Sequence, residues 1–178
     1  MKYDEIIGKY YPEDDELRRL LVRHSRQVAD LCLEVCSRHP EMGIDVCFVE
    51  EAAMLHDIGI RWCHAPGIYC FGEEPYLRHG LIGGCVLRKE GLSDHARVCE
   101  RHTGAGITRE QIEKRQLPLP LDDYLPETLE EQLVCYADKF FSKSHPDRLL
   151  TADQAAKSLE PFGTDGVERF MHWHKLFG

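Results

Sequence analysis

Apolar side chains recur every three or four residues along most of this chain, which is the spacing of one face of an α-helix. The clearest stretch is 14–38, where the recurring residues are Leu17, Leu20, Leu21, His24, Val28, Leu31, Cys32 and Val35. No stretch alternates apolar and polar residues as a half-buried strand does. The pattern therefore predicts an all-α fold.

Capping signals divide the rest of the chain into further helices. Asp45 is a plausible N-cap for a helix that runs through His56 and ends at Gly59. Three threonine capping boxes open later helices, and they are Thr108 with Gln111, Thr128 with Glu131, and Thr151 with Gln154. The remaining predicted helices are 75–90, Ser93 to about His102, and one that opens at Thr164 or Asp165. The segments 61–74 and 116–127 are predicted loops, and the whole chain, 1–178, is predicted to form one helical bundle.

Charge and composition restrict the partners that we expect. The 178 residues carry a net charge of −9 with histidine neutral. Binding to a nucleic-acid backbone depends on clustered Lys and Arg, so we expect no nucleic-acid polymer as a partner. No run approaches the ~20 apolar residues of a membrane span, and the N-terminus does not resemble a signal peptide. We expect a cytoplasmic protein with no membrane partner and with its eight cysteines reduced; the oligomeric state stays open.

Six metal-ligating side chains fall on the apolar faces of the predicted helices. The first helix contributes one histidine, the second ends in a histidine and an aspartate within "HDIG", and the others contribute two histidines and an aspartate. These residues are His24, His56, Asp57, His79, His102 and Asp138. Taken singly, each histidine has a plain interpretation as a packed core residue, and Asp138 as a partner of a nearby Lys or Arg.

Taken together, the six residues favour one site. A buried carboxylate without a partner costs several kcal/mol, so Asp57 and Asp138 each need one. Four imidazoles and two carboxylates satisfy each other jointly by binding metal, and this mixture suits Fe, Mn, Zn or similar divalent ions. The sequence therefore predicts a metal cluster.

The order H…HD…H…H…D, with the literal string "HDIG", resembles the HD superfamily of metal-dependent phosphohydrolases. The strings "RHGLIGG" (78–84), "ERHTGAG" (100–106) and "YADKF" (136–140) are similar to segments of its dinuclear branch, which includes HD-type diadenosine-tetraphosphate hydrolases. The resemblance implies a single HD domain over 1–178, with a motif core at about 20–145 and a helical extension at 146–178.

The resemblance also implies the roles of the six residues. His24, His56, Asp57 and Asp138 would hold one divalent ion, and Asp57 would bridge to a second ion held by His79 and His102. Iron is favoured by family likeness, with Mn, Mg or Zn as alternatives. A metal-bridged hydroxide would then attack a small nucleotide or another phosphorylated metabolite.

The residues expected to contact substrate are less clearly marked. Many relatives carry a lysine directly after "HDIG"; here Ile60 stands there and Arg61 follows, so Arg61 is a candidate replacement. Lys143 is a second catalytic candidate, and Lys139 a candidate phosphate ligand. In the loop 61–75, Trp62 and Tyr69 either stack a ring of the substrate or pin the loop to the core.

Two other functions share this pattern of ligands. Some HD proteins that resemble inositol oxygenase use a mixed-valent di-iron centre to activate O₂, although the string "HDIG" favours the hydrolase. A non-catalytic, metal-stabilised nucleotide-sensing domain is the other alternative. The presence of all six ligands argues against a degenerate sensor.

Overall fold

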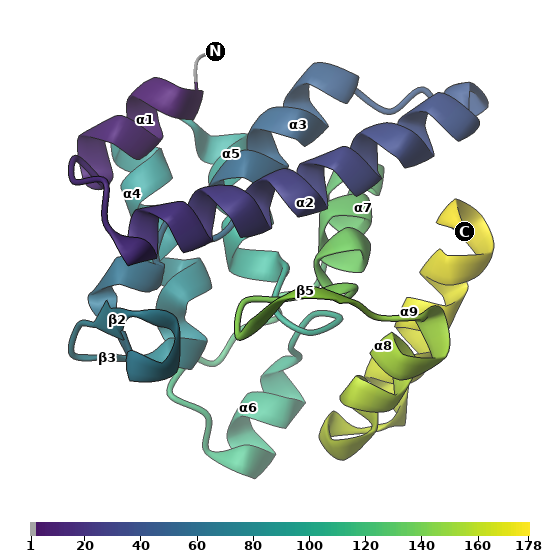
Figure 1. The fold of residues 1–178 in the computed structure, drawn as a ribbon. Helices are drawn as coiled ribbons and strands as arrows, with labels where there is room; N and C mark the ends of the chain where they lie inside the picture. The colour runs from purple at the N-terminus through teal and green to yellow at the C-terminus, as the bar shows by residue number, and fades with distance from the viewer. Residues whose placement is uncertain (1–2) are drawn as a thin grey trace.

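Helices dominate the computed structural model, which describes residues 3–178 (Figure 1). The α-helices are α1 (Tyr3–Tyr10), α2 (Glu16–Arg38), α3 (Val46–Leu55), α4 (His79–Lys89), α5 (Ser93–Arg101), α6 (Arg109–Arg115), α7 (Leu129–Asp138), α8 (Ala152–Leu159) and α9 (Thr164–Phe177). Short 3-10 helices lie at Pro40–Met42, Ile60–Trp62, Pro66–Ile68, Tyr76–Arg78 and Glu160–Phe162. The prediction of a mainly helical fold is confirmed, and α1 is a helix that was not predicted.

Four of the predicted helix starts coincide with observed side-chain caps, whereas the helix predicted from residue 75 begins at His79. The side chain of Asp45 accepts a hydrogen bond from the backbone N–H of Phe48 at the start of α3. Thr108, Thr128 and Thr151 all form complete capping boxes at α6, α7 and α8. Each box satisfies backbone N–H groups that have no partner within the helix, which is why these starts are visible in the sequence.

The chain is not purely α-helical, because two small sheets form in segments without a predicted strand. Strands β1 (Cys63–Ala65), β2 (Cys70–Phe71) and β3 (Glu74–Pro75) form one sheet in the order β2-β1-β3. Its β1–β2 pair is antiparallel and its β1–β3 pair is parallel. Strands β4 (Phe141–Ser142) and β5 (His145–Leu149) form an antiparallel hairpin. Strands this short carry too few residues to show the period of two from which a strand is predicted.

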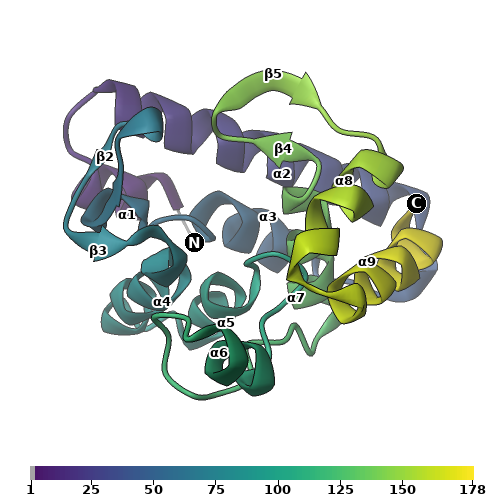
Figure 2. The same cartoon turned by 90° about the horizontal axis from the view of Figure 1, so that it is seen from below.

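Helix α2 is the long element around which the site is arranged (Figures 1 and 2). It packs against α3 and α7, while α4 packs against α5, and α9 packs against α7. The buried core includes Leu21 and Val28 of α2, Leu55 of α3 and Val134 of α7, all with 0% exposure. Among residues 3–178, no helix combines the length and the apolar character that crossing a bilayer requires.

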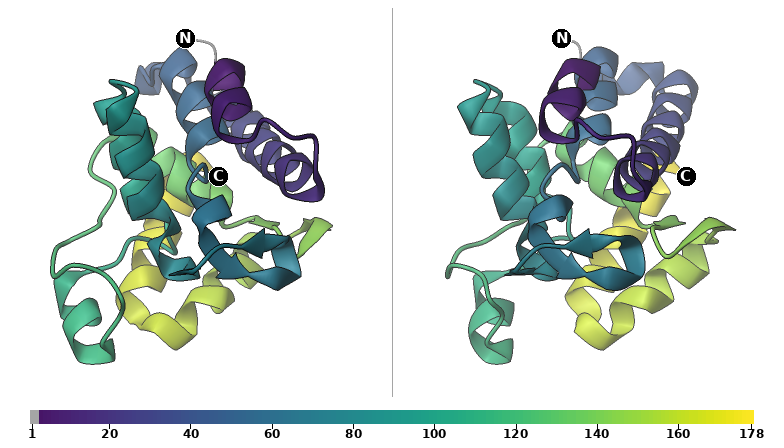
Figure 3. Two further views of the ribbon diagram at one scale, coloured as in Figure 1. Left: turned by 90° about the vertical axis from the view of Figure 1, so that its left-hand side faces the viewer. Right: turned by 60° about the vertical axis from the view of Figure 1, so that its left-hand side comes forward.

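The two sheets lie on the same side of α2, below it in the views of Figures 1 and 3. Residues from the β1–β2 segment and from the hairpin line one open cavity, and these are Ala65, Pro66, Gly67, Ile68, Tyr76, Lys143 and Ser144. The hairpin is also tied to α2, because Nε2 of Gln27 donates a hydrogen bond of 2.9 Å to the carbonyl of Pro146. The non-helical segments therefore cover the end of the bundle where the histidines gather.

Candidate metal centre

All six predicted ligands converge in the interior, although they come from five different helical segments. His24 lies within α2, and His56 and Asp57 directly follow α3. His79 begins α4, His102 directly follows α5, and Asp138 ends α7. Five of them are buried, with exposures of 0–3%. The Asp138 side chain keeps 15% of its surface exposed.

One oxygen of Asp57 faces the first group of side chains. Its Oδ2 lies 3.4 Å from Nε2 of His24 and 3.2 Å from Nε2 of His56. Oδ1 of Asp138 lies 2.9 Å from the same atom of His24 and 3.5 Å from that of His56. The imidazoles of His24 and His56 and the carboxylates of Asp57 and Asp138 therefore surround one small volume.

The other oxygen of Asp57 faces a second, different group. Its Oδ1 lies 3.4 Å from Nε2 of His79 and 3.5 Å from Nε2 of His102. The two Nε2 atoms are 3.0 Å apart. Asp57 therefore stands between two sets of donor atoms and turns one oxygen toward each set.

Hydrogen bonds to the backbone fix the protonation of three of the histidines. Nδ1 of His56 lies 2.6 Å from the carbonyl of Ala53, and Nδ1 of His79 and His102 lies 2.7 Å from the carbonyls of Tyr76 and Cys99. A carbonyl only accepts, so each Nδ1 carries the proton. In the neutral rings, each Nε2 then presents a lone pair, as a metal-ligating histidine does.

This arrangement fits a bound cation. With both Nδ1 atoms protonated, neutral His79 and His102 would point two lone pairs at each other across 3.0 Å, which is unfavourable unless a cation lies between them. Nε2 of His56 and Oδ1 of Asp57 are buried and make no hydrogen bond within residues 3–178. Two sets of side chains each lie close enough together to bind one ion. The first set is His24, His56 and Asp138, and the second is His56, Asp57 and His102.

The electrostatics of the cluster are dominated by burial and by the two carboxylates. Burial lowers the pKa of His79 to about 3. Burial also opposes protonation of His56, but Asp57 and Asp138 outweigh it and raise its pKa to about 10. Burial would raise the pKa of Asp57, but Lys143 and His56 outweigh it and hold this pKa well below its usual range. Both the anionic charge and a neutral imidazole are therefore available to a metal.

Close glycine contacts position the second set of donors. A Cβ on Gly59 would lie 2.1 Å from the carbonyl oxygen of His79 and 2.5 Å from the backbone N of Gly83. A Cβ on Gly80 would lie 2.4 Å from the carbonyl oxygen of Cys99. The glycine of "HDIG" thus lets α4 approach the aspartate, and Gly80 lets α5 approach α4.

Lys143, predicted as a catalytic candidate, lies against the cluster. Helix α7 ends at Asp138, and Lys143 follows β4 in the hairpin. Its Nζ lies 2.6 Å from Oδ2 of Asp57, and 13% of the side chain is exposed. The hairpin therefore brings a buried cation to the same oxygen that faces His24 and His56.

The other predicted substrate residues do not join the cluster. Lys139 lines a cavity beside it, and the Lys139 ammonium forms no ion pair with residues 3–178. The Arg61 guanidinium lies over the rings of Tyr11 and Trp62, at 5.3 and 5.6 Å from their centroids. Trp62 is half-buried against the core, whereas Tyr69 is 48% exposed. Their roles toward substrate stay predictions, and the packing of Trp62 is that of a residue that pins the loop.

Two tyrosines near the site were not predicted. The ring of Tyr76 stacks on His79, with centroids 4.7 Å apart, and its carbonyl orients that histidine. The hydroxyl of Tyr11 donates a hydrogen bond of 2.8 Å to the carbonyl of Ile58, next to Asp57. The only signal for Tyr76 is its position three residues before a predicted ligand. Tyr11 lies outside the segments in which ligands were sought.

Comparison with known proteins gives a family match and several relatives. The family model described as "HD domain" matches residues 21–142. A tRNA (cytidine(56)-2'-O)-methyltransferase of Thermoplasma volcanium is 32% identical over 174 residues, which are 97% of this chain and 44% of the relative. One with the same name from Picrophilus torridus is 32% identical over 170 residues, 90% of this chain and 44% of the relative. An uncharacterized protein of Methanocaldococcus jannaschii is 37% identical over 121 residues, 66% of this chain and 64% of the relative.

The chain spans less than half the length of the two methyltransferases that it matches, at 44% of each. No solved structure matches the chain. The prediction that no nucleic-acid polymer is a partner is wrong, because these two relatives are named for an action on tRNA. The prediction relied on the net charge of −9, which sums over the whole surface and does not describe a local contact.

The HD match begins just before His24 and ends just after Asp138, so it contains all six residues of the cluster. HD domains bind divalent metals, which agrees with the donor groups found here. The division into a motif core at about 20–145 and a helical extension at 146–178 stays a prediction. Because the family model matches more than half of this chain, the chain belongs to the HD-domain family.

Proposed function

We propose that this chain is a metal-dependent phosphohydrolase or phosphodiesterase. The observation that carries the proposal is the position of Asp57, whose Oδ2 faces His24 and His56 while its Oδ1 faces His79 and His102. A carboxylate between two sets of donors is the arrangement that two divalent ions require. We assign the first ion to His24, His56, Asp57 and Asp138, and the second to Asp57, His79 and His102, with iron favoured over Mn, Mg and Zn.

Two divalent ions at this position would supply Lewis acidity and a water of lowered pKa. The protein supplies the orientation of the donors. The backbone carbonyls of Ala53, Tyr76 and Cys99 hold three of the imidazoles with Nε2 inward. Because the cluster is buried, few waters compete with a phosphate for these groups.

Lysines are the proposed contacts to the substrate. If Asp57 held a metal, the ammonium of Lys143 would be free of this ion pair and would be available to bind a phosphate oxygen. Lys139 follows Asp138 directly and has no ion-pair partner within residues 3–178, so its charge is also available. Arg61 lies over two aromatic rings, and its predicted catalytic role requires its side chain to leave them.

The tRNA methyltransferase relatives widen the range of substrates. More than half of each of those proteins lies outside the 44% that matches this chain, and we assign methyl transfer to that other part. Imidazoles and carboxylates are ligands for a metal rather than for a methyl donor. We propose that the phosphate which this site hydrolyses belongs to a nucleotide, either free or at the end of an RNA.

Phosphate release tests the proposal. The protein would be purified without chelator, its metal content measured, and its activity assayed on bis-p-nitrophenyl phosphate, nucleotides and RNAs that end in a phosphate. We expect turnover that needs metal and that Asp57→Asn lowers by at least ~100-fold, since the carboxylate that joins both sets is lost. Asp30→Asn is the matched control, because Asp30 is an exposed aspartate of α2 that pairs with Arg26 on the surface and with none of the six cluster residues.

The same protein samples separate the alternatives. Oxygen consumption by the ferrous protein with no phosphate release would favour the oxygenase. Tight nucleotide binding with neither reaction would favour the sensing domain. Either result would replace the phosphohydrolase proposal.

A further inference from the structure

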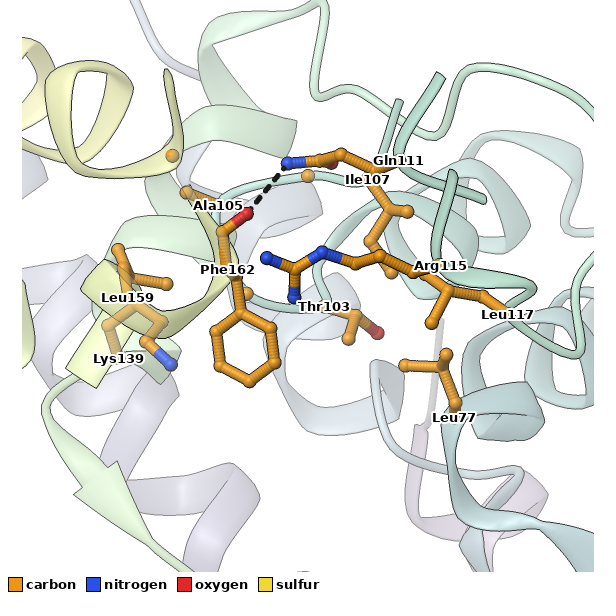
Figure 4. Close-up of a pocket in the computed structure, with 13 residues that line it drawn as sticks. Leu77, Thr103, Ala105, Ile107, Gln111, Arg115, Leu117, Lys139, Leu159 and Phe162 are labelled. Atoms are coloured by element: carbon orange, nitrogen blue, oxygen red, sulfur yellow. Dashed lines mark hydrogen bonds between the residues drawn. The ribbon is translucent and has the colours of Figure 1, made fainter. Parts of the chain in front are cut away.

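A cavity of about 260 Å³ opens between Thr103, Lys139 and Phe162 (Figure 4). It is formed by the loop after His102, the helix α6, the end of α7, and the segment from the end of α8 to the start of α9. The residues that line it are Leu77, Thr103, Gly104, Ala105, Gly106, Ile107, Gln111, Arg115, Leu117, Lys139, Leu159, Phe162 and Gly166. Most of them are apolar or small.

Three residues that line the cavity are close neighbours, along the chain, of proposed metal ligands, although none of the six ligands lines the cavity itself. Thr103 follows His102, Lys139 follows Asp138, and Leu77 precedes His79 by two residues. Consecutive Cα atoms are ~3.8 Å apart, so these wall residues start within one or two such steps of three proposed ligands. At three points of the cavity wall the backbone is therefore continuous with the backbone that carries the cluster.

An exposed aromatic ring forms one wall and is held in place. Phe162 is 59% exposed, and the Arg115 guanidinium lies 5.5 Å from its ring centroid. Nε2 of Gln111 donates a hydrogen bond of 3.3 Å to the carbonyl of Phe162, and Arg115 donates one of 2.8 Å to the carbonyl of Pro161. A ring that is exposed but anchored is suited to stack on a planar group of a ligand.

Glycines keep the floor of the cavity open. Gly104 adopts φ +66, and the nearest atom to a Cβ built there is Cδ2 of Leu159 at 3.9 Å. At Gly166 the nearest atom to such a Cβ is Cβ of Ala105, also at 3.9 Å. Side chains at these two positions would occupy the cavity rather than contact a packed wall.

We propose that this cavity binds the nucleobase of the substrate, an assignment that rests on the proposed phosphohydrolase function. Its volume of about 260 Å³ is slightly below the ~300–1,000 Å³ of typical ligand pockets, which suits one end of a nucleotide rather than the whole molecule. The ammonium of Lys139 has no ion-pair partner within residues 3–178 and lies in the wall between the cavity and Asp138. It would contact the phosphate that joins the base-bearing end to the metals.

Two variants test the cavity without changing a proposed ligand. Gly166→Leu places a side chain in it, and because Gly166 lies in α9, the change also favours the helix. Gly8→Leu is its matched control, since Gly8 lies in α1 and a Cβ there meets nothing within 4 Å. Phe162→Ala removes the exposed ring.

Calorimetry on the metal-loaded protein would measure binding of AMP, GMP, CMP, UMP, the four free nucleosides and inorganic pyrophosphate. We expect Gly166→Leu and Phe162→Ala to weaken the best nucleoside monophosphate on the order of tenfold, the size of a lost base stack. Pyrophosphate binding should not change in either variant, and Gly8→Leu should bind all ligands like the wild type.

The proposal is overturned if no nucleotide or nucleoside binds better than pyrophosphate, or if both cavity variants bind nucleotides as the wild type does. Phosphate release, measured in parallel, keeps the two proposals apart. If the cavity variants lose nucleotide binding while the wild type hydrolyses nothing, the base site stands and the phosphohydrolase fails. If all variants hydrolyse nucleotides with the wild-type KM, the phosphohydrolase stands and the base site fails.

Discussion

Nζ of Lys143 lies 2.6 Å from Oδ2 of Asp57, so a cation of the protein neutralises the carboxylate that faces both sets of histidines. The lysine comes from a hairpin, and the aspartate from the turn after α3. Both side chains are largely shielded from water, with 13% and 0% exposure. In the metal-free protein this pair therefore stabilises a carboxylate that burial would otherwise disfavour.

Lys143→Met is expected to destabilise the metal-free protein. Removing one partner of a buried ion pair costs up to ~3–5 kcal/mol, and here His56, 3.2 Å from the same oxygen, offsets part of that loss. For a chain of this size the melting temperature in chelator should fall by roughly 10 °C. A divalent ion should restore most of this loss, since it supplies the missing positive charge.

Lys139→Met is the control for this experiment, because the Lys139 ammonium forms no ion pair within residues 3–178. It should change the melting temperature in chelator by only a few degrees. Equal melting of the Lys143→Met variant and the wild type in chelator would mean that the lysine does not compensate Asp57.

Because the two carboxylate oxygens of Asp57 face different histidines, we can predict how many metal ions each variant retains. Elemental analysis of the wild type should give two ions per chain. His79→Gln and His102→Gln remove donors that face only Oδ1, so each should leave about one ion. Asp57→Asn should leave none, because it is the one side chain that faces both sets. Retention of both ions by His79→Gln would show that the second set does not bind metal.

Gly59→Ala should disrupt the contact between the "HDIG" turn and α4. The new Cβ would lie 2.1 Å from the carbonyl oxygen of His79 and 2.5 Å from the backbone N of Gly83, so α4 has to move. We expect a loss of ~1–3 kcal/mol in the free energy of unfolding and weaker binding of the second ion. Chemical denaturation and metal titration measure the two effects.

Gly8→Ala is the matched control for this prediction, because a Cβ on Gly8 meets nothing within 4 Å. Gly8 lies inside α1, so alanine should stabilise the protein by up to ~1 kcal/mol. If Gly59→Ala were as stable as Gly8→Ala and bound metal equally well, close packing of α4 would not be what requires the glycine.

Two of the eight thiols should react rapidly in the native protein. Cys47 and Cys85 are exposed, while Cys32, Cys36, Cys63, Cys70, Cys99 and Cys135 are buried. Burial raises the pKa of Cys63 to about 11 and that of Cys70 to about 12, so neither forms a thiolate at neutral pH. Titration with an aromatic disulfide should count two fast thiols in buffer and eight in denaturant. A count of four or more in buffer would contradict the packing described for the β1–β3 sheet and the core.

The sequence alone determined the helices after α1 and the identity of the clustered residues. Asp45, Thr108, Thr128 and Thr151 mark helix starts because capping depends on residues within one turn of each other. His24 and the other five residues can be recognised in the sequence because burying polar, metal-ligating groups on apolar helix faces costs free energy unless they bind a common partner.

Tertiary structure decided what depends on residues far apart in the chain. It placed Lys143 at Asp57 through a hairpin of two short strands, which no local pattern reveals. It also packed the Arg61 side chain on aromatic rings and formed a cavity from α6, α8 and the loop after His102. Helical periodicity and capping are local effects, whereas the direction in which a loop side chain points is set by whatever packs against it. That is why the six candidate ligands could be read from the sequence, and the surroundings of the substrate only from the fold.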